Sequence, residues 1–278
     1  MGVCCCFDLA SVNFFCGNFM NLRKSIRFNQ NFFKDAGLVA AIVRQADFNP
    51  QDIVYEIGSG QGIITRELAK KVKKVVAVEI DKELFIRLKQ KLAIYPNVQL
   101  INDDFLKYKI PDLIYKVFAN IPFNITADVL RKLLTVISPP ISAYLVVQKE
   151  AGQKFAGTPK ETQFSILAKP WFELEIVRSF RKTDFEPMPS VETVLLKITK
   201  RSEALVAKSA KDDYFWFVQY GFNRWRANLG KNFKEVFTYK QWHRLAHDLK
   251  FQLKAQPTDL TFNQWLGIFN FYLKTVLK

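Results

Sequence analysis

The sequence predicts an α/β protein with a mostly parallel central sheet, an antiparallel edge and a small all-helical C-terminal domain. Apolar runs rich in Val, Ile and Tyr alternate with helical patterns through the first part of the chain. This alternation is typical of a parallel sheet covered by helices on both faces. Two further strand-like runs follow without a helix between them, and beyond residue 200 only helical spacing of aromatic residues remains.

The first predicted element is a helix at 35–47, where apolar residues have helical spacing and Asp35 stands at the front. Strands and helices then alternate along the chain. The predicted strands are 52–58, 74–80, 98–102, 115–120 and 142–148, and the predicted helices between and after them are 62–71, 81–93, 127–137 and 150–156. The runs 172–180 and 191–199 are the predicted antiparallel pair at one edge of the sheet.

The charge of the chain favours a polyanionic partner. Its 278 residues contain 41 Lys and Arg against 26 Asp and Glu, which gives a net charge of +15 and an isoelectric point near 9.6. Such an excess suits a nucleic acid first and an anionic membrane surface second. A solvated basic surface without a specific partner is the remaining alternative.

The cysteines indicate a reducing compartment, so we expect a cytoplasmic protein. All of them lie near the N-terminus, where their spacing suits neither a disulfide framework nor a zinc site: Cys4, Cys5, Cys6 and Cys16. The same N-terminal stretch lacks the basic start and cleavage site of a signal peptide, and Asp8 interrupts its apolar run, so we expect no membrane span.

Three segments are predicted. Residues 1–28 form an N-terminal extension that is poorly ordered or dispensable, with Met20 as a candidate start of translation. Residues 29–201 form the α/β domain that carries the chemistry. Residues 202–278 form a basic helical domain.

A glycine-rich turn follows the first predicted strand in "VYEIGSGQG", which contains Glu56, Gly58, Gly60 and Gly62. Glycines there let the backbone approach a ligand closely at the edge where an open sheet binds its ligands. The spacing G-x-G-x-G differs from the dinucleotide fingerprint G-x-G-x-x-G. It therefore favours a nucleoside ligand without pyrophosphate.

Acidic residues end the next two strands. Glu79, at the tip of "VAVEI", is placed to accept hydrogen bonds from ribose hydroxyls. Asp104, with Asp103 as the alternative, could accept the amine of an adenine ring, while the backbone N–H of Phe105 addresses a ring nitrogen. Taken singly, each acidic residue is better interpreted as a solvated loop carboxylate. Together with the glycines they indicate S-adenosylmethionine.

The stretch "FANIPFNIT" follows a further strand and suggests a base-binding corner. Asn120 carries an amide that both donates and accepts, Pro122 stiffens the backbone, and Phe123 offers a face on which a nucleobase can stack. Its alternative is an ordinary corner with an exposed aromatic side chain.

Taken together, these stretches resemble the class I (Rossmann-like) methyltransferases and, within them, the rRNA adenine N6-methyltransferases. The resemblance rests on "NQNFF", "EIGSGQGIIT", "AVEID", "NDDFLKY", "NIPFNIT" and "FEPMPSVETVLLKI", in this order over residues 29–200. Ile121 and Phe123 favour the erythromycin-resistance (Erm) branch, which acts on 23S rRNA, over the branch that dimethylates 16S rRNA. The resemblance implies resistance to macrolides, lincosamides and type B streptogramins.

The resemblance also implies the roles of the site residues. The expected catalytic set is Asn31, Asn120, Ile121, Pro122, Phe123 and Phe185, and the expected cofactor set is Gln30, Asn31, Glu56, Gly58, Gly60, Gly62, Glu79, Ile80, Asp104, Phe105 and Asn120. Phe185 would cover the second face of the target adenine, with core packing as its alternative. For Gln30 and Asn31 the alternative is a cap of the helix near Asp35.

The expected partner is 23S rRNA, bound by a monomer without a membrane or a metal. His243 and His247 stand at i and i+4, but they lack the Glu of H-E-x-x-H and a third ligand. The rival functions are 16S rRNA dimethylation and nucleic-acid binding on the same fold without turnover. Neither the number of methyl groups added nor the state of the rRNA substrate follows from the sequence.

Overall fold

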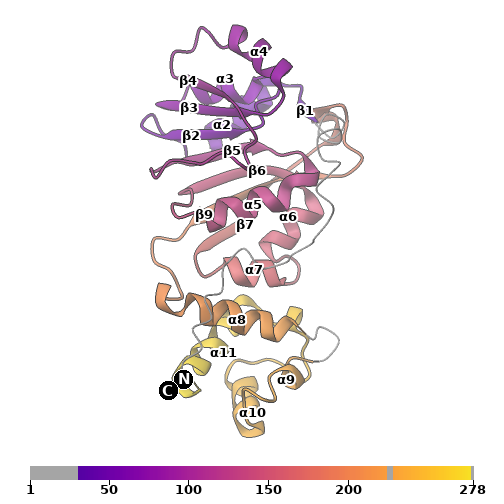
Figure 1. The fold of residues 1–278 in the computed structure, drawn as a ribbon. Helices are drawn as coiled ribbons and strands as arrows, with labels where there is room; N and C mark the ends of the chain where they lie inside the picture. The colour runs from indigo at the N-terminus through magenta and orange to yellow at the C-terminus, as the bar shows by residue number, and fades with distance from the viewer. Residues whose placement is uncertain (1–30, 224–227, 277–278) are drawn as a thin grey trace.

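The computed structural model describes residues 31–223 and 228–276. Its α/β part is built on a seven-stranded sheet of order β4-β3-β2-β5-β6-β9-β7 (Figure 1). These strands are β2 (Ile53–Ile57), β3 (Lys74–Glu79), β4 (Val98–Asn102), β5 (Lys116–Asn120), β6 (Ser142–Gln148), β7 (Phe172–Phe180) and β9 (Thr193–Lys200). Strands β2 to β6 pair in parallel, and β9 runs antiparallel to both β6 and β7. The predicted fold class and antiparallel edge are confirmed.

Helices cover both faces of this sheet because its central strands are apolar on both sides. Val54 of β2 belongs to a core shared with α2 and α3, whereas its neighbour Tyr55 belongs to a core shared with α5. The helices are α2 (Ala36–Gln45), α3 (Ile63–Ala69), α4 (Lys82–Lys91), α5 (Thr126–Thr135), α6 (Lys149–Ala156) and α7 (Gln163–Ala168). Asp35 caps α2 by accepting a hydrogen bond from the Gly37 N–H.

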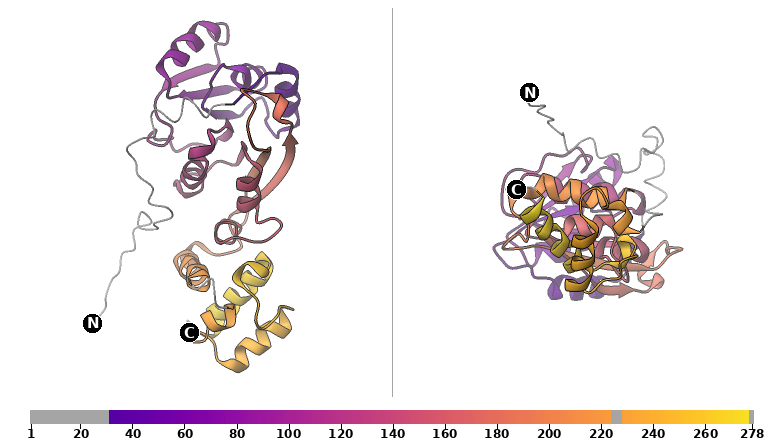
Figure 2. Two further views of the ribbon diagram at one scale, coloured as in Figure 1. Left: turned by 90° about the vertical axis from the view of Figure 1, so that its right-hand side faces the viewer. Right: turned by 90° about the horizontal axis from the view of Figure 1, so that it is seen from below.

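The C-terminal helices form a third core at one end of the molecule (Figure 2). They are α8 (Lys211–Phe222), α9 (Leu229–Asn232), α10 (Tyr239–Asp248) and α11 (Phe262–Thr275). Stacked and edge-on aromatic rings fill this core, with Phe217, Phe233 and Trp265 fully buried. Ile166 of α7 also belongs to it, so the helical end is packed directly onto the α/β part. The division of the chain at residue 201 stays a prediction.

A second, two-stranded sheet was not predicted. It pairs β1 (Phe32–Phe33) with β8 (Phe185–Glu186) in antiparallel register, Phe33 opposite Phe185. Both strands are only two residues long, so they carry no periodic pattern that could be read from the sequence. This pairing joins the "NQNFF" and "FEPMP" motifs and holds Asn31 beside the carboxyl edge of the main sheet.

The predictions on the N-terminal extension and on membrane spans depend on which residues the structure describes. The N-terminal extension 1–28 and its candidate start at Met20 lie outside the described residues. Within 31–223 and 228–276, no helix has the length and apolar character needed to cross a membrane.

Candidate active site

The loop between β2 and α3 has a shape that only glycine adopts without strain. Gly60 has a φ of 53°, and a Cβ atom there would lie 2.4 Å from Cε1 of Phe32. Gly62 precedes α3 with a φ of 79°, and a Cβ atom there would lie 2.7 Å from Leu88 of α4. The loop therefore packs tightly between a side chain from β1 and a helix, at the carboxyl edge of the sheet.

Glu79 anchors this loop from the end of β3. Its Oε2 accepts a hydrogen bond from the Gly60 N–H and its Oε1 accepts one from the Asp81 N–H, both at 2.9 Å. Burial raises the pKa of the Glu79 carboxyl, while these two backbone donors oppose the rise. Each carboxylate oxygen has two lone pairs, so the carboxylate can accept further hydrogen bonds, but the Glu79 side chain is fully buried in this structure.

The segment after β4 supplies the second acid. Asp104 Oδ1 accepts a hydrogen bond from the Leu106 N–H at 2.9 Å, and the other oxygen accepts none from the described residues. Lys132 of α5 holds this segment by donating to the carbonyls of Phe105 and Tyr108, and its Nζ lies 4.6 Å from the centre of the Phe105 ring. Lys132 escaped the sequence analysis because no motif marks it.

Half of the predicted site residues that the structure describes lie together around one cavity of about 30 Å³. Seven predicted residues line it, joined by Phe32, which the sequence analysis had not assigned: Asn31, Gly58, Gly60, Asn120, Ile121, Pro122 and Phe123. The Nδ2 group of Asn120 donates to the backbone carbonyl of Asn31 at 2.6 Å. This bond turns the amide so that Oδ1 of Asn120 is the atom left to accept a hydrogen bond.

The predicted role of Phe185 as a wall of the target site is wrong in this conformation. Its side chain is 1% exposed and packs on Phe33, with ring centres 4.6 Å apart, and on Phe180. Phe185 instead packs in the core, which was the alternative interpretation, because the pairing of β1 with β8 turns its ring inward. Phe185 positions β1, and through it Asn31. Ile80 is 41% exposed beside Glu79, and Gln30 lies outside the described residues.

Glu56 does not line the cavity, although it was predicted to bind the cofactor. It is fully buried on β2, and neither of its carboxyl oxygens has a hydrogen-bond partner among the residues that the structure describes. Burial raises its pKa from 4.5 to about 8. The Glu56 carboxyl is therefore mostly protonated at neutral pH.

This buried carboxyl predicts a pH dependence of stability. Between pH 4.5 and about 8 the folded protein keeps the Glu56 proton while the unfolded chain releases it. The free energy of unfolding should fall as pH rises through that window, by up to about 1.4 kcal/mol per pH unit. In the Glu56→Gln variant this contribution is absent. Urea unfolding at pH 5 to 8 measures this dependence. The free energy of unfolding should change less with pH in Glu56→Gln than in the wild type and in the exposed control Glu83→Gln. The same change with pH in all three proteins would contradict the prediction.

The residues present fit S-adenosylmethionine. Gly58 and Gly60 line the cavity without side chains, and the carboxylates of the buried Glu79 and the half-buried Asp104 retain lone pairs for ribose hydroxyls and an amine. When bound, this cofactor supplies a methyl group on a positively charged sulfur. The sheet order and the glycine-rich loop thus define a Rossmann-like, S-adenosylmethionine-dependent methyltransferase.

Comparison with known proteins gives the family. A family model described as "Ribosomal RNA adenine dimethylase" matches residues 21–274. The chain belongs to this family and is an rRNA adenine N6-methyltransferase that uses S-adenosylmethionine.

Relatives of two kinds are similar to this chain. A "Ribosomal RNA small subunit methyltransferase A" of Staphylococcus carnosus is 33% identical over 78% of this chain and 77% of the relative. An "rRNA adenine N-6-methyltransferase" of Bacillus anthracis is 29% identical over 91% of this chain and 89% of the relative. Among solved structures, the 23S rRNA methyltransferase ErmE matches with a TM-score of 0.82 and 27% identity, over 88% of this chain and 100% of that chain.

Proposed function

We propose that this enzyme methylates N6 of one adenine in the peptidyl-transferase loop of 23S rRNA and so confers resistance to macrolides, lincosamides and type B streptogramins. The observation that carries the proposal is the likeness to ErmE, which extends over 88% of this chain. The Asn-Ile-Pro-Phe run at 120–123 agrees with it. A methylated N6 loses a hydrogen-bond donor and gains bulk, which obstructs the docking of a drug.

The proposed chemistry begins with the weak nucleophilicity of adenine N6, whose lone pair is delocalised into the ring. Oδ1 of Asn120 and the backbone carbonyl of Ile121 each accept one N6–H. These two bonds localise the lone pair and direct it at the methyl group. The bond from Asn120 to the Asn31 carbonyl holds the amide in the required orientation before the substrate arrives.

Phe123 is the proposed stacking partner of the flipped adenine. It is half-buried at the start of a short 3-10 helix (Phe123–Ile125), directly after Pro122. Stacking on an aromatic side chain contributes about 1 to 3 kcal/mol per base. No strong base is required, because the methylated amine is acidic enough to lose its proton to water.

The cofactor end of the proposed site is formed by Gly58, Gly60, Glu79 and Asp104, with Ile80 and Phe105 beside the acids. Glu79 accepts the ribose hydroxyls and Asp104 accepts the adenine amine of the cofactor. Lys132 keeps the backbone of Phe105 in place. In this proposal Glu56 does not contact the cofactor, and it supports the glycine loop as a buried neutral side chain on β2.

The rival substrate is 16S rRNA. It is favoured by the relative named small subunit methyltransferase A, which is 33% identical over 78% of this chain. In vitro methylation of protein-free 23S and 16S rRNA separates the two, with primer extension to map the modified adenine. We expect one stop in the peptidyl-transferase loop of 23S rRNA, from an enzyme that acts in the cytoplasm as a monomer.

Drug susceptibility provides a second readout of the same proposal. Expression of the wild-type chain in a susceptible bacterium should raise the inhibitory concentration of a macrolide, and expression of Asn120→Ala should not. Methylation of 16S rRNA alone, without any change in drug susceptibility, would replace the 23S proposal by the 16S one. Binding of rRNA without methyl transfer to either would refute both.

A further inference from the structure

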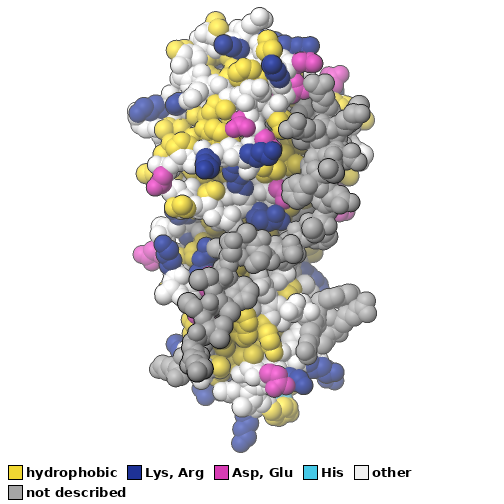
Figure 3. Space-filling model, in the orientation of Figure 1, with side chains coloured by type: hydrophobic (Ala, Val, Ile, Leu, Met, Phe, Trp, Pro, Cys, Tyr) yellow, Lys and Arg dark blue, Asp and Glu magenta, His cyan; other side chains and the backbone are white. Residues whose placement is uncertain are grey.

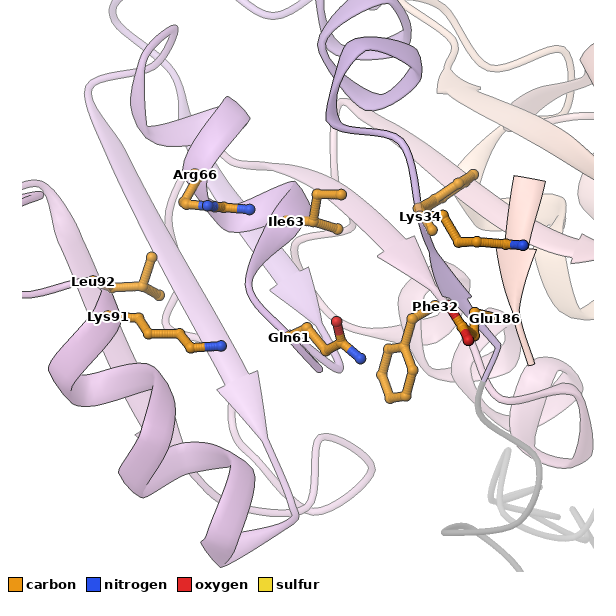
Figure 4. A pocket seen from close by; sticks show the side chains of 9 residues that line it. Phe32, Lys34, Gln61, Ile63, Arg66, Lys91, Leu92 and Glu186 are labelled. Atoms are coloured by element: carbon orange, nitrogen blue, oxygen red, sulfur yellow. The ribbon is translucent and has the colours of Figure 1, made fainter. Parts of the chain in front are cut away.

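A second pocket, of about 520 Å³, shares Phe32 with the cavity around Asn120. The described residues that line it come from β1, α3, α4 and β8: Phe32, Phe33, Lys34, Gln61, Ile63, Arg66, Lys91, Leu92 and Glu186. Figure 4 shows Arg66 and Lys91 extending from two helices toward Gln61 and Phe32. This pocket contains none of the residues predicted to hold the cofactor or the target base.

The lining of this pocket is positively charged, and its basic side chains are exposed and unpaired among the described residues. It carries three basic side chains, Lys34, Arg66 and Lys91, against the single carboxylate of Glu186. All three basic side chains are exposed, and none forms an ion pair or a side-chain hydrogen bond with the described residues. On the face drawn in Figure 3, Lys and Arg side chains are scattered rather than gathered. A guanidinium, an ammonium and an amide that converge on one space suit a phosphate group.

We propose that this pocket binds a backbone phosphate of the rRNA, next to the nucleotide whose base enters the cavity at Asn120. The inference rests on the proposed function, since it takes that cavity as the target site. Phe32 lines both cavities, so they are neighbours. A flipped nucleotide keeps its bonds to the phosphates on either side, and in this proposal one of these phosphates lies between Arg66 and Lys91.

Phosphate contacts have a distinctive salt dependence, because each one releases condensed counterions from the RNA. We expect the double variant Arg66→Ala/Lys91→Ala to bind rRNA more weakly than the wild type and with a salt slope smaller by about 1, the change for one lost phosphate contact. Between 50 and 200 mM salt its deficit in affinity should then shrink about 4-fold. A phosphate carries no sequence information, so the deficit should be equal for an rRNA fragment with the target adenine and one with guanine in its place.

The matched control is Lys73→Ala/Lys89→Ala, which removes the same charge from exposed positions outside the pocket. Lys73 directly precedes β3, and Lys89 lies about 200° around α4 from Lys91. The control should keep the wild-type salt slope to within a few tenths. Calorimetry should give the same S-adenosylmethionine affinity for the wild type and for both double variants.

Two results would overturn the inference. One is an rRNA affinity and salt slope of Arg66→Ala/Lys91→Ala that match those of the control. The other is a loss of cofactor affinity in that variant, which would assign the pocket to the cofactor instead. The rRNA affinities are measured on 23S and 16S rRNA, and the cofactor affinity is measured by calorimetry. The wild type used in these experiments must methylate one of the two rRNAs. If the wild type methylates neither, the proposed function fails separately.

Discussion

Replacing Asn120 by Ala is expected to lower the rate of methyl transfer by about 10²- to 10³-fold at saturating cofactor, the loss typical of removing one preorganised group from an active site. The variant loses the Oδ1 acceptor of the proposed N6–H bond. It also leaves the Asn31 carbonyl without the 2.6 Å bond from Asn120. Single-turnover methylation of rRNA measures the effect directly.

The control for this variant is Asn124→Ala, which removes the same side chain four residues later at an exposed position outside the cavity. It should keep the wild-type rate. Cofactor binding and thermal unfolding report whether Asn120→Ala is still folded. A folded Asn120→Ala variant that methylates at the rate of Asn124→Ala would remove Asn120 from the proposed mechanism.

Replacing Glu79 by Ala is expected to weaken S-adenosylmethionine binding by at least about 100-fold. Two effects add. The proposed ribose acceptors disappear, and the backbone N–H groups of Gly60 and Asp81 lose the carboxylate that accepts their bonds at 2.9 Å. Hydrogen bonds to charged groups contribute about 1.5 to 3 kcal/mol each, so the loop should lose its shape as well as a ligand contact. Calorimetric titration with the cofactor measures the change.

Glu79→Gln serves as the second variant in case Glu79→Ala does not fold, since Gln fills the same space. Its amide replaces one acceptor oxygen by a donor that faces a backbone N–H, so cofactor binding should still weaken. Glu83→Ala, in the first turn of α4 and exposed, should bind as the wild type does. Equal affinities of Glu79→Gln and Glu83→Ala would exclude the ribose role.

Sequence reasoning succeeded where a pattern is local. The strands of the main sheet and the helices after them follow from runs such as 74–80 and 142–148, whose apolar periodicity is set by burial on one or both faces. The glycine loop and the Asn120–Phe123 corner were recognisable for the same reason. Backbone conformation and hydrogen-bonding capacity are properties of those residues themselves.

It failed where a role depends on a distant partner. Phe185 was assigned to the target base, but pairing of β1 with β8 buries it against Phe33. Lys132 holds the segment after β4 across 27 residues of chain, through its bond to the Phe105 carbonyl. Neither contact leaves a periodic mark in the sequence, because each joins segments that only the folded chain brings together.

The sequence by itself determined the class of the protein, its cofactor chemistry and most of the residues that line the cavity at Asn120. Only the tertiary structure decided which atoms of those residues are available. It turns the Asn120 amide toward Asn31, buries Glu56 without a partner and gathers Arg66 and Lys91 beside Phe32. The physical reason is that hydrogen-bond partners, burial and electrostatic neighbours are set by packing between segments far apart in the chain.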